Sequence, residues 1–339
     1  SLGHSFSSKS DTEVMLLAFL EWGVEKALGR LEGMFAFAYL DIDADQLTIG
    51  RDRMGEKPLY YGEVENSFVF GSELKSLKMF PAGTRFKYNQ QAISEFTQFG
   101  FIPGPQTIYN GISKLPPGHL LQLHVGSGQK KIFPYWSLQD SAKIGLAKPY
   151  EGSYESAVND LDSLLKSIVS EQMVADVPVG VFLSGGIDST LISSLMQLES
   201  KNKVKSFTIG FSEKEFDEAR YAREVAAHIG TEHIELYVTA QDALRVIERL
   251  PQIYDEPFAD SSQIPTFLVA ELASKKVNVC LTGDGGDEIF GGYNRHYLGN
   301  TYWSVIQKIP YPVRKKIVAL LQLLPLGYRN RFLKFLENT

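Results

Sequence analysis

The sequence predicts two parts of different fold class, an α+β N-terminal part and then an α/β part with a doubly wound parallel sheet. Up to residue 136, short strands follow one another through turns such as the DIDAD segment at 41–45, as in antiparallel hairpins. After residue 153, apolar strands alternate with amphipathic helices, which indicates right-handed crossovers between parallel strands. A length of 339 residues agrees with two domains of about 150 residues each.

In the first part, Asp11 is predicted to cap a helix from Thr12 to about Trp22, and residues 33–40 and 46–50 are predicted strands. Residues 60–61 and 67–70 form a predicted hairpin around the turn GEVEN. Up to Trp136 we therefore expect antiparallel strands with two helices. The charged residues Arg51, Asp52, Lys57 and Glu73 are expected to stabilise turns through ion pairs.

In the second part, a polar connection at 137–153 precedes a helix whose apolar residues, from Ala157 to Val169, form one stripe. The pattern that follows predicts strands at 179–183, 205–211, 233–239 and 277–281, and helices at 190–199, 216–230, 241–254 and 264–275.

Bulk properties exclude several classes of protein. A net charge of −6 argues against general nucleic-acid binding, and a single cysteine, Cys280, excludes an internal disulfide. No uninterrupted apolar run reaches the roughly 18 residues of a membrane span, and the N-terminus has no secretory signal. A cytoplasmic location is therefore expected.

The chemistry is expected around residues 177–189, VPVGVFLSGGIDS. An apolar strand, a Gly-rich loop and a helix in this order form an anion site, because loop amides and the helix N-terminus converge there. No lysine follows the glycines, so this is not a Walker A loop. The loop instead offers hydroxyls and the carboxylate of Asp188, which could lie beside phosphates only with a divalent cation between them. The prediction is a site for the pyrophosphate part of ATP with Mg²⁺, suited to adenylation.

A second Gly-rich loop, TGDGGDE at 282–288, follows the predicted strand 277–281 and carries three carboxylates. Ligands of parallel sheets bind beyond the carboxyl ends of the strands. Three like charges close together also need a cation to compensate them. Both loops are therefore expected to serve one site.

SGGIDS resembles the PP-loop of the ATP pyrophosphatases, and with TGDGGDEIFGGY it resembles the synthetase domain of the glutamine-hydrolysing asparagine synthetases. The resemblance implies an adenine nucleotide α-hydrolase-like fold, with Asp188 and Asp287 as Mg²⁺ ligands. It implies Asp284 as a catalytic residue near the aspartyl and ammonia groups, where many members have the longer glutamate. The implied nucleotide contacts are Leu183, Ser184, Gly185, Gly186, Asp188, Ser189, Ile209 against the adenine, Thr282 and Gly283.

The words SDTE, LEGMFAFAYLD, GRDRMGEKPLYYG, FGSELKSL and KLPPGH resemble the later part of the glutaminase domain of the same family. The resemblance implies an incomplete Ntn-hydrolase-like sandwich in which Asp11 holds the α-ammonium group of glutamine. That family uses an N-terminal cysteine as nucleophile, and this sequence has none, so we expect a fragment without glutaminase activity. The expected organisation is a class II amidotransferase part at 1–138, a linker at 139–153 and the N-terminal part of the synthetase domain at 154–339.

The resemblance implies that ATP activates aspartate as β-aspartyl-AMP with release of pyrophosphate, and that glutamine-derived ammonia then gives asparagine. Two alternatives stay open: an amidotransferase for another carboxylate, such as an acidic sugar or a β-lactam precursor, and a non-catalytic nucleotide-binding interaction module. A homodimer is the assembly considered.

The tail at 301–339 has seven Lys/Arg and one acidic residue. A helical segment without its packing partners is favoured over a membrane-surface amphipathic helix.

Overall fold

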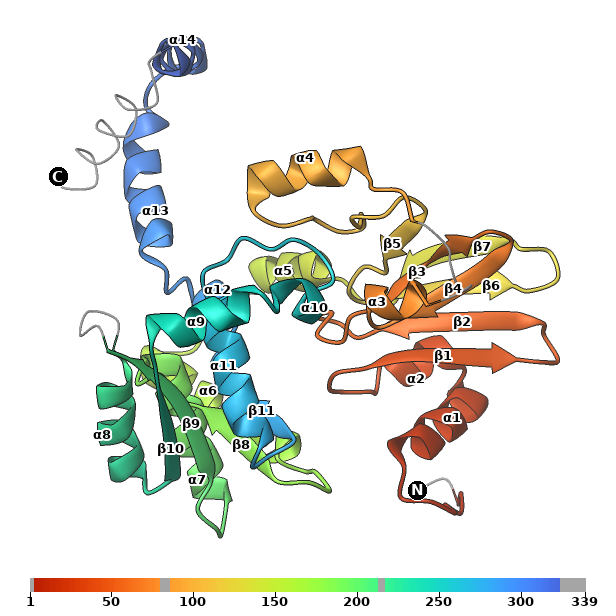
Figure 1. Ribbon diagram of the computed structural model, residues 1–339, viewed down its shortest axis with the longest axis horizontal. Helices are drawn as coiled ribbons and strands as arrows, with labels where there is room; N and C mark the ends of the chain where they lie inside the picture. The colour runs from red at the N-terminus through yellow and green to blue at the C-terminus, as the bar shows by residue number, and fades with distance from the viewer. Residues whose placement is uncertain (1–2, 80–85, 213–216, 324–339) are drawn as a thin grey trace. The chain divides into compact units, whose positions relative to one another are not determined.

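The computed structural model describes residues 3–79, 86–212 and 217–323 (Figure 1). The first elements in chain order are α1 (Asp11–Trp22), α2 (Val24–Leu28), β1 (Ala36–Asp41), β2 (Gln46–Arg51), β3 (Tyr60–Val64), β4 (Ser67–Gly71), α3 (Leu74–Leu77), α4 (Gln90–Phe99), β5 (Ile112–Lys114), β6 (His119–His124) and β7 (Lys130–Pro134).

These strands form two antiparallel sheets, with strand orders β1-β2-β6-β7 and β4-β3-β5. The predicted hairpin is confirmed, because Tyr61 pairs with Phe70 in the β3–β4 register. On the four-stranded sheet, Ile49 and Leu121 are buried in one apolar cluster, while Phe37 and Leu120 belong to another that includes Phe19 of α1. The sheet is therefore covered by apolar side chains on both faces, as the alternation of strand residues requires.

Three predictions for this part are wrong in detail. The helix cap is Ser10, whose side chain accepts a hydrogen bond from the amide of Thr12, so Asp11 is the first helical residue. The first strand begins at Ala36 because Gly33 has a φ of +100°, outside the β region. The described residues before 136 include four helices where two were predicted, since α2 and α3 have only 5 and 4 residues and show no helical period.

Ion pairs were expected at four charged residues, and Glu73 forms one with Lys75 at 3.6 Å. The turn after β2 is instead held by hydrogen bonds between side chains and the backbone. The guanidinium of Arg51 donates to the carbonyl oxygens of Gly55, Lys57 and Leu115 at 2.5, 2.9 and 2.8 Å. Asp52, 1% exposed, accepts from the amides of Glu56 and Lys57, each at 2.9 Å. These side chains supply the hydrogen-bond partners that the backbone groups of the turn would otherwise lack.

The remaining elements are α5 (Leu138–Ala147), α6 (Tyr154–Gln172), β8 (Val179–Phe182), α7 (Ile187–Glu199), β9 (Lys205–Phe211), α8 (Ala219–Ile229), β10 (Glu232–Val238), α9 (Ala240–Ile247), α10 (Leu250–Ile253), α11 (Gln263–Ser274), β11 (Val279–Leu281), α12 (Gly286–Phe290), α13 (Asn294–Ile306) and α14 (Tyr311–Gln322).

The predicted polar connection contains α5, and its N-cap is Ser137, where the side chain accepts from the amide of Asp140 at 3.2 Å. No helix was predicted here, because the capping serine stands among Gly, Pro and Ser residues that favour a loop. None of the residues of α5 is buried.

The predicted parallel sheet is confirmed, with strand order β10-β9-β8-β11. β8 pairs in parallel with β9 on one side and with β11 on the other, so that Val181 lies beside both Ser206 and Leu281. Helix α7 begins at Ile187, three residues earlier than predicted, and this places Asp188 and Ser189 in its first turn.

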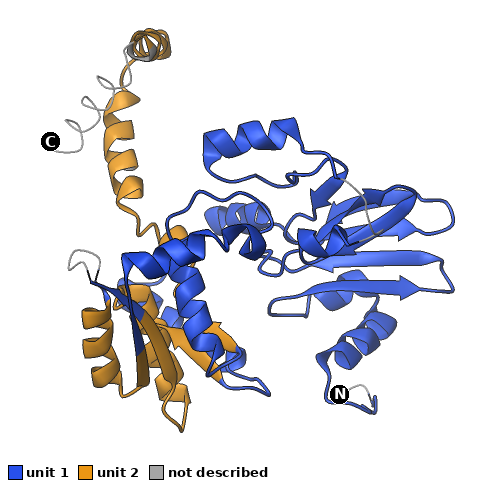
Figure 2. Cartoon of the chain, in the orientation of Figure 1, with its two compact units in different colours: residues 1–178, 209–218, 235–278 blue, residues 179–208, 219–234, 279–339 orange. Residues whose placement is uncertain are grey.

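The chain divides into two compact units (Figure 2). One comprises residues 1–178, 209–218 and 235–278, and the other 179–208, 219–234 and 279–339. In the first unit, Val238, Val246 and Leu268 form a buried cluster, in addition to the clusters of the antiparallel sheets. In the second, Leu183 packs with Ala222 and Ala226.

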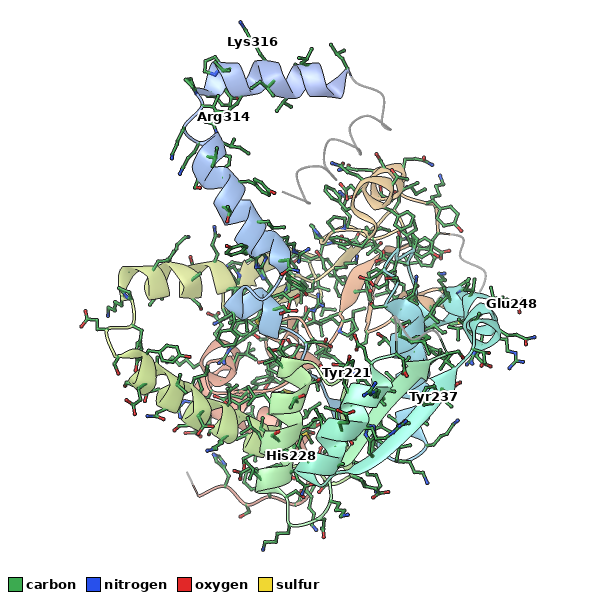
Figure 3. The ribbon with its side chains drawn as sticks, turned by 90° about the vertical axis from the view of Figure 1, so that its left-hand side faces the viewer. Tyr221, His228, Tyr237, Glu248, Arg314 and Lys316 are labelled. Atoms are coloured by element: carbon green, nitrogen blue, oxygen red, sulfur yellow. The ribbon has the colours of Figure 1, made fainter. Side chains whose placement is uncertain are left out.

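The cationic tail is described as far as residue 323, where α13 and α14 carry exposed apolar side chains such as Trp303 and Leu320. Arg314 and Lys316 lie on α14 (Figure 3), and the Arg314 guanidinium stacks 5.3 Å from the ring centre of Trp303. Both tail interpretations stay predictions, and residues 324–339 lie outside the described part. Among the helices that the structure describes, none is long and apolar enough to cross a membrane.

Candidate site at the ends of two parallel strands

The first site loop leaves the sheet directly after β8. Leu183 is 1% exposed, and its amide donates to the carbonyl of Phe207 at 3.0 Å, which continues the ladder between β8 and β9. Its side chain packs on Ala222 and Ala226 of α8. The buried leucine therefore anchors the loop at the carboxyl end of the strand, and Ser184 is the first exposed residue.

Gly185 is required by both conformation and space. Its φ is +82°, a region that side-chain-bearing residues rarely adopt. A Cβ atom there would lie 2.8 Å from Cβ of Tyr221 and 3.0 Å from the amide nitrogen of Ala222 (Tyr221 is labelled in Figure 3). The loop backbone therefore packs closely on α8.

A hydroxyl network shapes the rest of this loop. The Oγ atoms of Ser184 and Ser189 lie 2.9 Å apart, and the amide of Ser184 donates to Ser189 Oγ at 3.2 Å. The amide of Gly186 donates to Ser184 Oγ, also at 3.2 Å. Gly186 is the N-cap of α7 and supplies no side-chain cap. The positive end of a 13-residue helix thus faces the loop, an arrangement suited to an anion.

The second loop lies directly against the first turn of α7. A Cβ atom on Gly283 would lie 2.6 Å from the amide nitrogen of Ser189. A Cβ atom on Gly286 would lie 2.7 Å from both Cγ and Oδ2 of Asp188. The backbone of the second loop can approach the Asp188 carboxylate only because these residues are glycines. The two predicted motifs are therefore brought together, as the pairing of β8 with β11 requires.

Asp284 is held by its own loop. The hydroxyl of Thr282 donates to Asp284 Oδ2 at 2.9 Å, and the amide of Asp284 donates to Thr282 Oγ1 at 3.3 Å. The Asp284 side chain is exposed. It therefore has a defined place on the loop and access to a ligand.

Asp287 lies in the first turn of α12, and the chain folds back over it. The amide of Gly292 donates to the carbonyl of Asp287 at 3.0 Å, and a Cβ atom on Gly292 would overlap Asp287 Oδ1. The glycines of the FGGY sequence are therefore needed for this carboxylate to keep its place.

A side-chain group next to this loop was missed by the sequence reasoning. The hydroxyl of Tyr293 donates to Glu288 Oε1 at 2.5 Å, and the Arg295 guanidinium lies 4.3 Å from the centre of the Tyr293 ring. The hydrogen bond lowers the pKa of Glu288 and raises the pKa of Tyr293. The signal that could have indicated it is the continuation of the acidic loop into FGGYNR.

The carboxylates suit a Mg²⁺ ion that shares its ligands with a substrate. Among the described residues, no cluster of three or more His, Cys, Asp or Glu side chains could hold a metal by itself. Mg²⁺ is typically bound by one or two carboxylates together with phosphate oxygens and water. Gly286, the residue before Asp287, lies against the Asp188 carboxylate. This proximity of the two aspartates in the fold is compatible with such a ligand set.

Two predicted site residues lie elsewhere in the chain. Ile209 belongs to β9 and packs with the cluster of Val238, Val246 and Leu268. Asp11 is an exposed residue at the start of α1. The roles predicted for both stay predictions.

Two family models match the chain. The model of asparagine synthase covers residues 160–337, and the model of the glutamine amidotransferase domain covers residues 1–136. The chain belongs to the asparagine synthase family. The family's synthase match contains both loops of the site, and its junction with the amidotransferase match falls between residues 136 and 160.

Named relatives of the family agree with this membership. "Asparagine synthetase [glutamine-hydrolyzing] 1" of Bacillus subtilis (strain 168) is 32% identical over 98% of this chain and 50% of its own length. "Putative asparagine synthetase [glutamine-hydrolyzing] 2" of Methanocaldococcus jannaschii is 35% identical over 94% of this chain and 63% of its own length. The chain thus spans 50% and 63% of the length of these two relatives.

Among solved structures, an NH3-dependent NAD synthetase from Campylobacter jejuni is similar over 53% of this chain and 92% of its own, with 16% identity and a TM-score of 0.30. A similarity of that size supports no conclusion about this chain.

Proposed function

We propose that the site at the ends of β8 and β11 activates a carboxylate with ATP, and that the carboxylate is the side chain of aspartate. The observation that carries the proposal is the approach of Gly286 to the Asp188 carboxylate, which joins SGGIDS and TGDGGDE in one site. The family membership and the relatives' names support aspartate as the acceptor.

In the proposed reaction, an oxygen of the aspartate side chain attacks the α-phosphorus of ATP. The bond between the α-phosphorus and the bridging oxygen breaks, and pyrophosphate leaves. Ammonia then attacks the acyl carbon of β-aspartyl-AMP, AMP leaves with the electrons of the C–O bond, and the nitrogen loses a proton. The products are asparagine, AMP and pyrophosphate.

The residues of the chain would bind and orient the reactants. The amides at the start of α7 and the hydroxyls of Ser184 and Ser189 would hold the pyrophosphate group, since amides at a helix N-terminus favour negative charge. Asp188 and Asp287 would hold Mg²⁺, which neutralises charge on the departing phosphates when it is bound. Because these groups are already placed, little of the binding free energy is spent on ordering them.

Asp284 would accept the proton that the attacking nitrogen loses. Its carboxylate is exposed and oriented by the Thr282 hydroxyl. Its side chain is one methylene shorter than the glutamate that many family members have at this position. The identity of the acceptor carboxylate is therefore part of what the proposal has to test.

For the amidotransferase part, we propose that the two antiparallel sheets belong to an Ntn-hydrolase-like glutaminase fold. Asp11 would hold the α-ammonium group of glutamine. The match of residues 1–136 to the amidotransferase model supports this assignment.

The test is ATP–pyrophosphate exchange with Mg²⁺ and a panel of carboxylates that includes aspartate and acidic sugars. We expect exchange that depends on aspartate and falls at least about 100-fold in Asp188→Asn, within the range for removing one group that stabilises the transition state. Asp176→Asn, at an exposed aspartate before β8, is the matched control.

Exchange with another carboxylate would keep the mechanism and change the substrate. Nucleotide binding without exchange, in this chain and in a longer protein containing it, would favour a binding module instead.

A further inference from the structure

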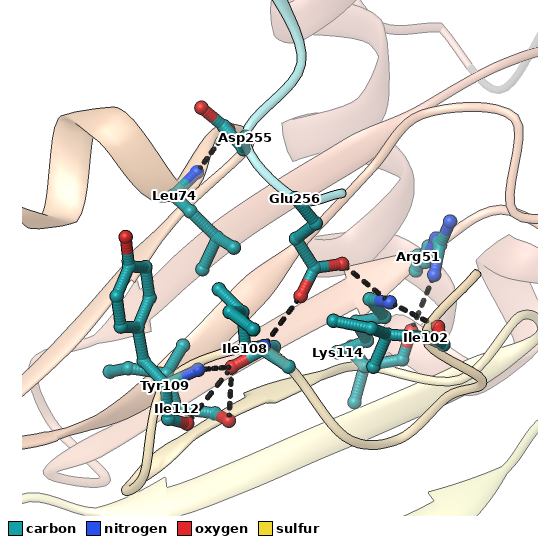
Figure 4. Close-up of polar contacts among 11 residues, drawn as sticks. Arg51, Leu74, Ile102, Ile108, Tyr109, Ile112, Lys114, Asp255 and Glu256 are labelled. Atoms are coloured by element: carbon teal, nitrogen blue, oxygen red, sulfur yellow. Dashed lines mark hydrogen bonds and ion pairs between the residues drawn. The ribbon is translucent and has the colours of Figure 1, made fainter. Parts of the chain in front are cut away.

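A short acidic segment makes long-range contacts that the proposed chemistry does not use. Residues 255–259 (DEPFA) connect α10 to α11 and belong to the asparagine synthase match. Their contacts are with residues 74, 75, 100, 108 and 114, which belong to the amidotransferase match. Figure 4 shows the contacts with Leu74, Ile108 and Lys114. All of these residues lie within one compact unit. The segment therefore joins the two family matches inside a single packed body.

Glu256 makes two of these contacts. Its Oε1 accepts from the amide of Ile108 at 2.7 Å, and its Oε2 lies 2.7 Å from Nζ of Lys114. The two charged side chains are only 12% and 19% exposed. Lys114 Nζ also donates to the carbonyl of Ile102 at 2.7 Å. A pair so far removed from water is costly to break from one side, because the remaining charge loses its partner.

Asp255 acts as a cap for a helix far away in the sequence. It accepts from the amides of Leu74 and Lys75 at 2.6 and 3.3 Å, and these amides begin α3. The N-cap of α3, Glu73, provides no side-chain cap of its own. Lys75 Nζ donates to the carbonyl of Gln252 at 3.1 Å and so holds the end of α10 as well.

Two further observations place the segment firmly. The amide of Ala259 donates to the carbonyl of Gly100 at 2.8 Å. Burial, followed by the negative charges of Glu256 and Asp255, raises the pKa of Tyr60 to about 12. Its contacts therefore reach α3, the end of α4 and β5 at once. In the chain, the segment is followed by α11, which leads into β11 and the Asp284 loop.

We propose that Asp255 and Glu256 are positioning residues that latch the synthase match onto the amidotransferase match, so that ammonia from glutamine is delivered to the acyl-adenylate. The proposal rests on the proposed function. The proposal gives neither residue a contact with the reactants. Loss of the latch separates the use of glutamine from amide formation while leaving ATP activation intact.

The test compares Glu256→Gln, Lys114→Met and the double variant in the full-length protein, with Glu271→Gln as the control. Glu271 pairs with Arg249 at 3.1 Å within the segment 235–278, so its loss removes an ion pair that does not reach the amidotransferase match. Product formation is measured with glutamine and with ammonia as nitrogen donor, together with ATP–pyrophosphate exchange.

We expect product formed per glutamine hydrolysed to fall about tenfold or more in Glu256→Gln, since small displacements of a positioned reactant cost up to about 100-fold. Ammonia-supported formation and exchange should stay within about twofold of the unsubstituted protein, as should every rate of the control. The double variant should be no worse than the worse single variant, because both remove one pair. An equal fall with both nitrogen donors, or no fall with either, overturns the proposal.

A second measurement separates failure of the latch from failure of the proposed function. Hydrogen exchange of the Ile108 and Leu74 amides reports on their acceptors directly, whatever reaction the protein catalyses. We expect about tenfold faster hydrogen exchange at the Ile108 amide in Glu256→Ala and at the Leu74 amide in Asp255→Ala. In each variant, the amide bound by the other carboxylate should keep its exchange rate. Unchanged protection at both amides overturns the latch, whereas absence of exchange of pyrophosphate in the unsubstituted protein overturns only the function.

Discussion

Gly286→Ala tests the site with the smallest change that the structure allows. The added Cβ would lie 2.7 Å from both Cγ and Oδ2 of Asp188. Carbon atoms in contact are most stable about 3.5–4.0 Å apart, so the carboxylate or the second loop has to move by about 1 Å. The backbone itself can accept alanine, because Gly286 does not have a positive φ.

A displacement of about 1 Å in a positioned group can lower a rate about 100-fold, which corresponds to about 2.7 kcal/mol in the activation free energy. We therefore expect kcat/KM for aspartate-dependent ATP–pyrophosphate exchange to fall by about this factor. Raising the Mg²⁺ concentration should recover part of the loss, since the carboxylate is displaced and not removed.

The matched control is Gly299→Ala in α13, where an added Cβ meets no atom within 4 Å. This variant should keep both its exchange rate and its melting temperature. If Gly286→Ala kept exchange within about twofold of the unsubstituted chain, the inference that Asp188 serves this site would be refuted. A variant that lost exchange but also melted far below the control would point to misfolding, and Gly283→Ala would then be examined in the same way.

Two further predictions concern groups outside the loops. Burial raises the pKa of the Cys280 thiol to about 11, so iodoacetamide should label it slowly at pH 7.5 and faster as the pH rises towards 11. The thiol ionises more readily in the unfolded chain. Its contribution to stability is therefore complete below the pKa of the unfolded chain and is lost as the pH rises from that value to about 11. Equally fast labelling of the folded and the urea-unfolded chain at pH 7.5 would contradict the raised pKa. Asp52→Ala should lower the free energy of unfolding by about 1–3 kcal/mol for each of the two amides that it leaves without an acceptor, measured by urea denaturation against the exposed control Asp43→Ala.

The sequence by itself determined the alternating strands and helices of the parallel sheet and the location of the candidate site. Hydrophobic periodicity is a local property, so the strands at 179–183 and 205–211 could be recognised without knowledge of their partners. Parallel strands end at one edge of a sheet, and this general rule was sufficient to expect the SGGIDS and TGDGGDE loops side by side.

Only the tertiary structure decided which atoms meet. The approach of Gly283 and Gly286 to the start of α7 depends on the register of β8 with β11, which no local pattern encodes. The same holds for Asp255, which caps a helix 181 residues away in the sequence. In the structure, the carboxylates of this acidic segment bind amides and a lysine of the amidotransferase match. Such contacts arise when distant segments pack and each buried charge has to find its partner within the fold.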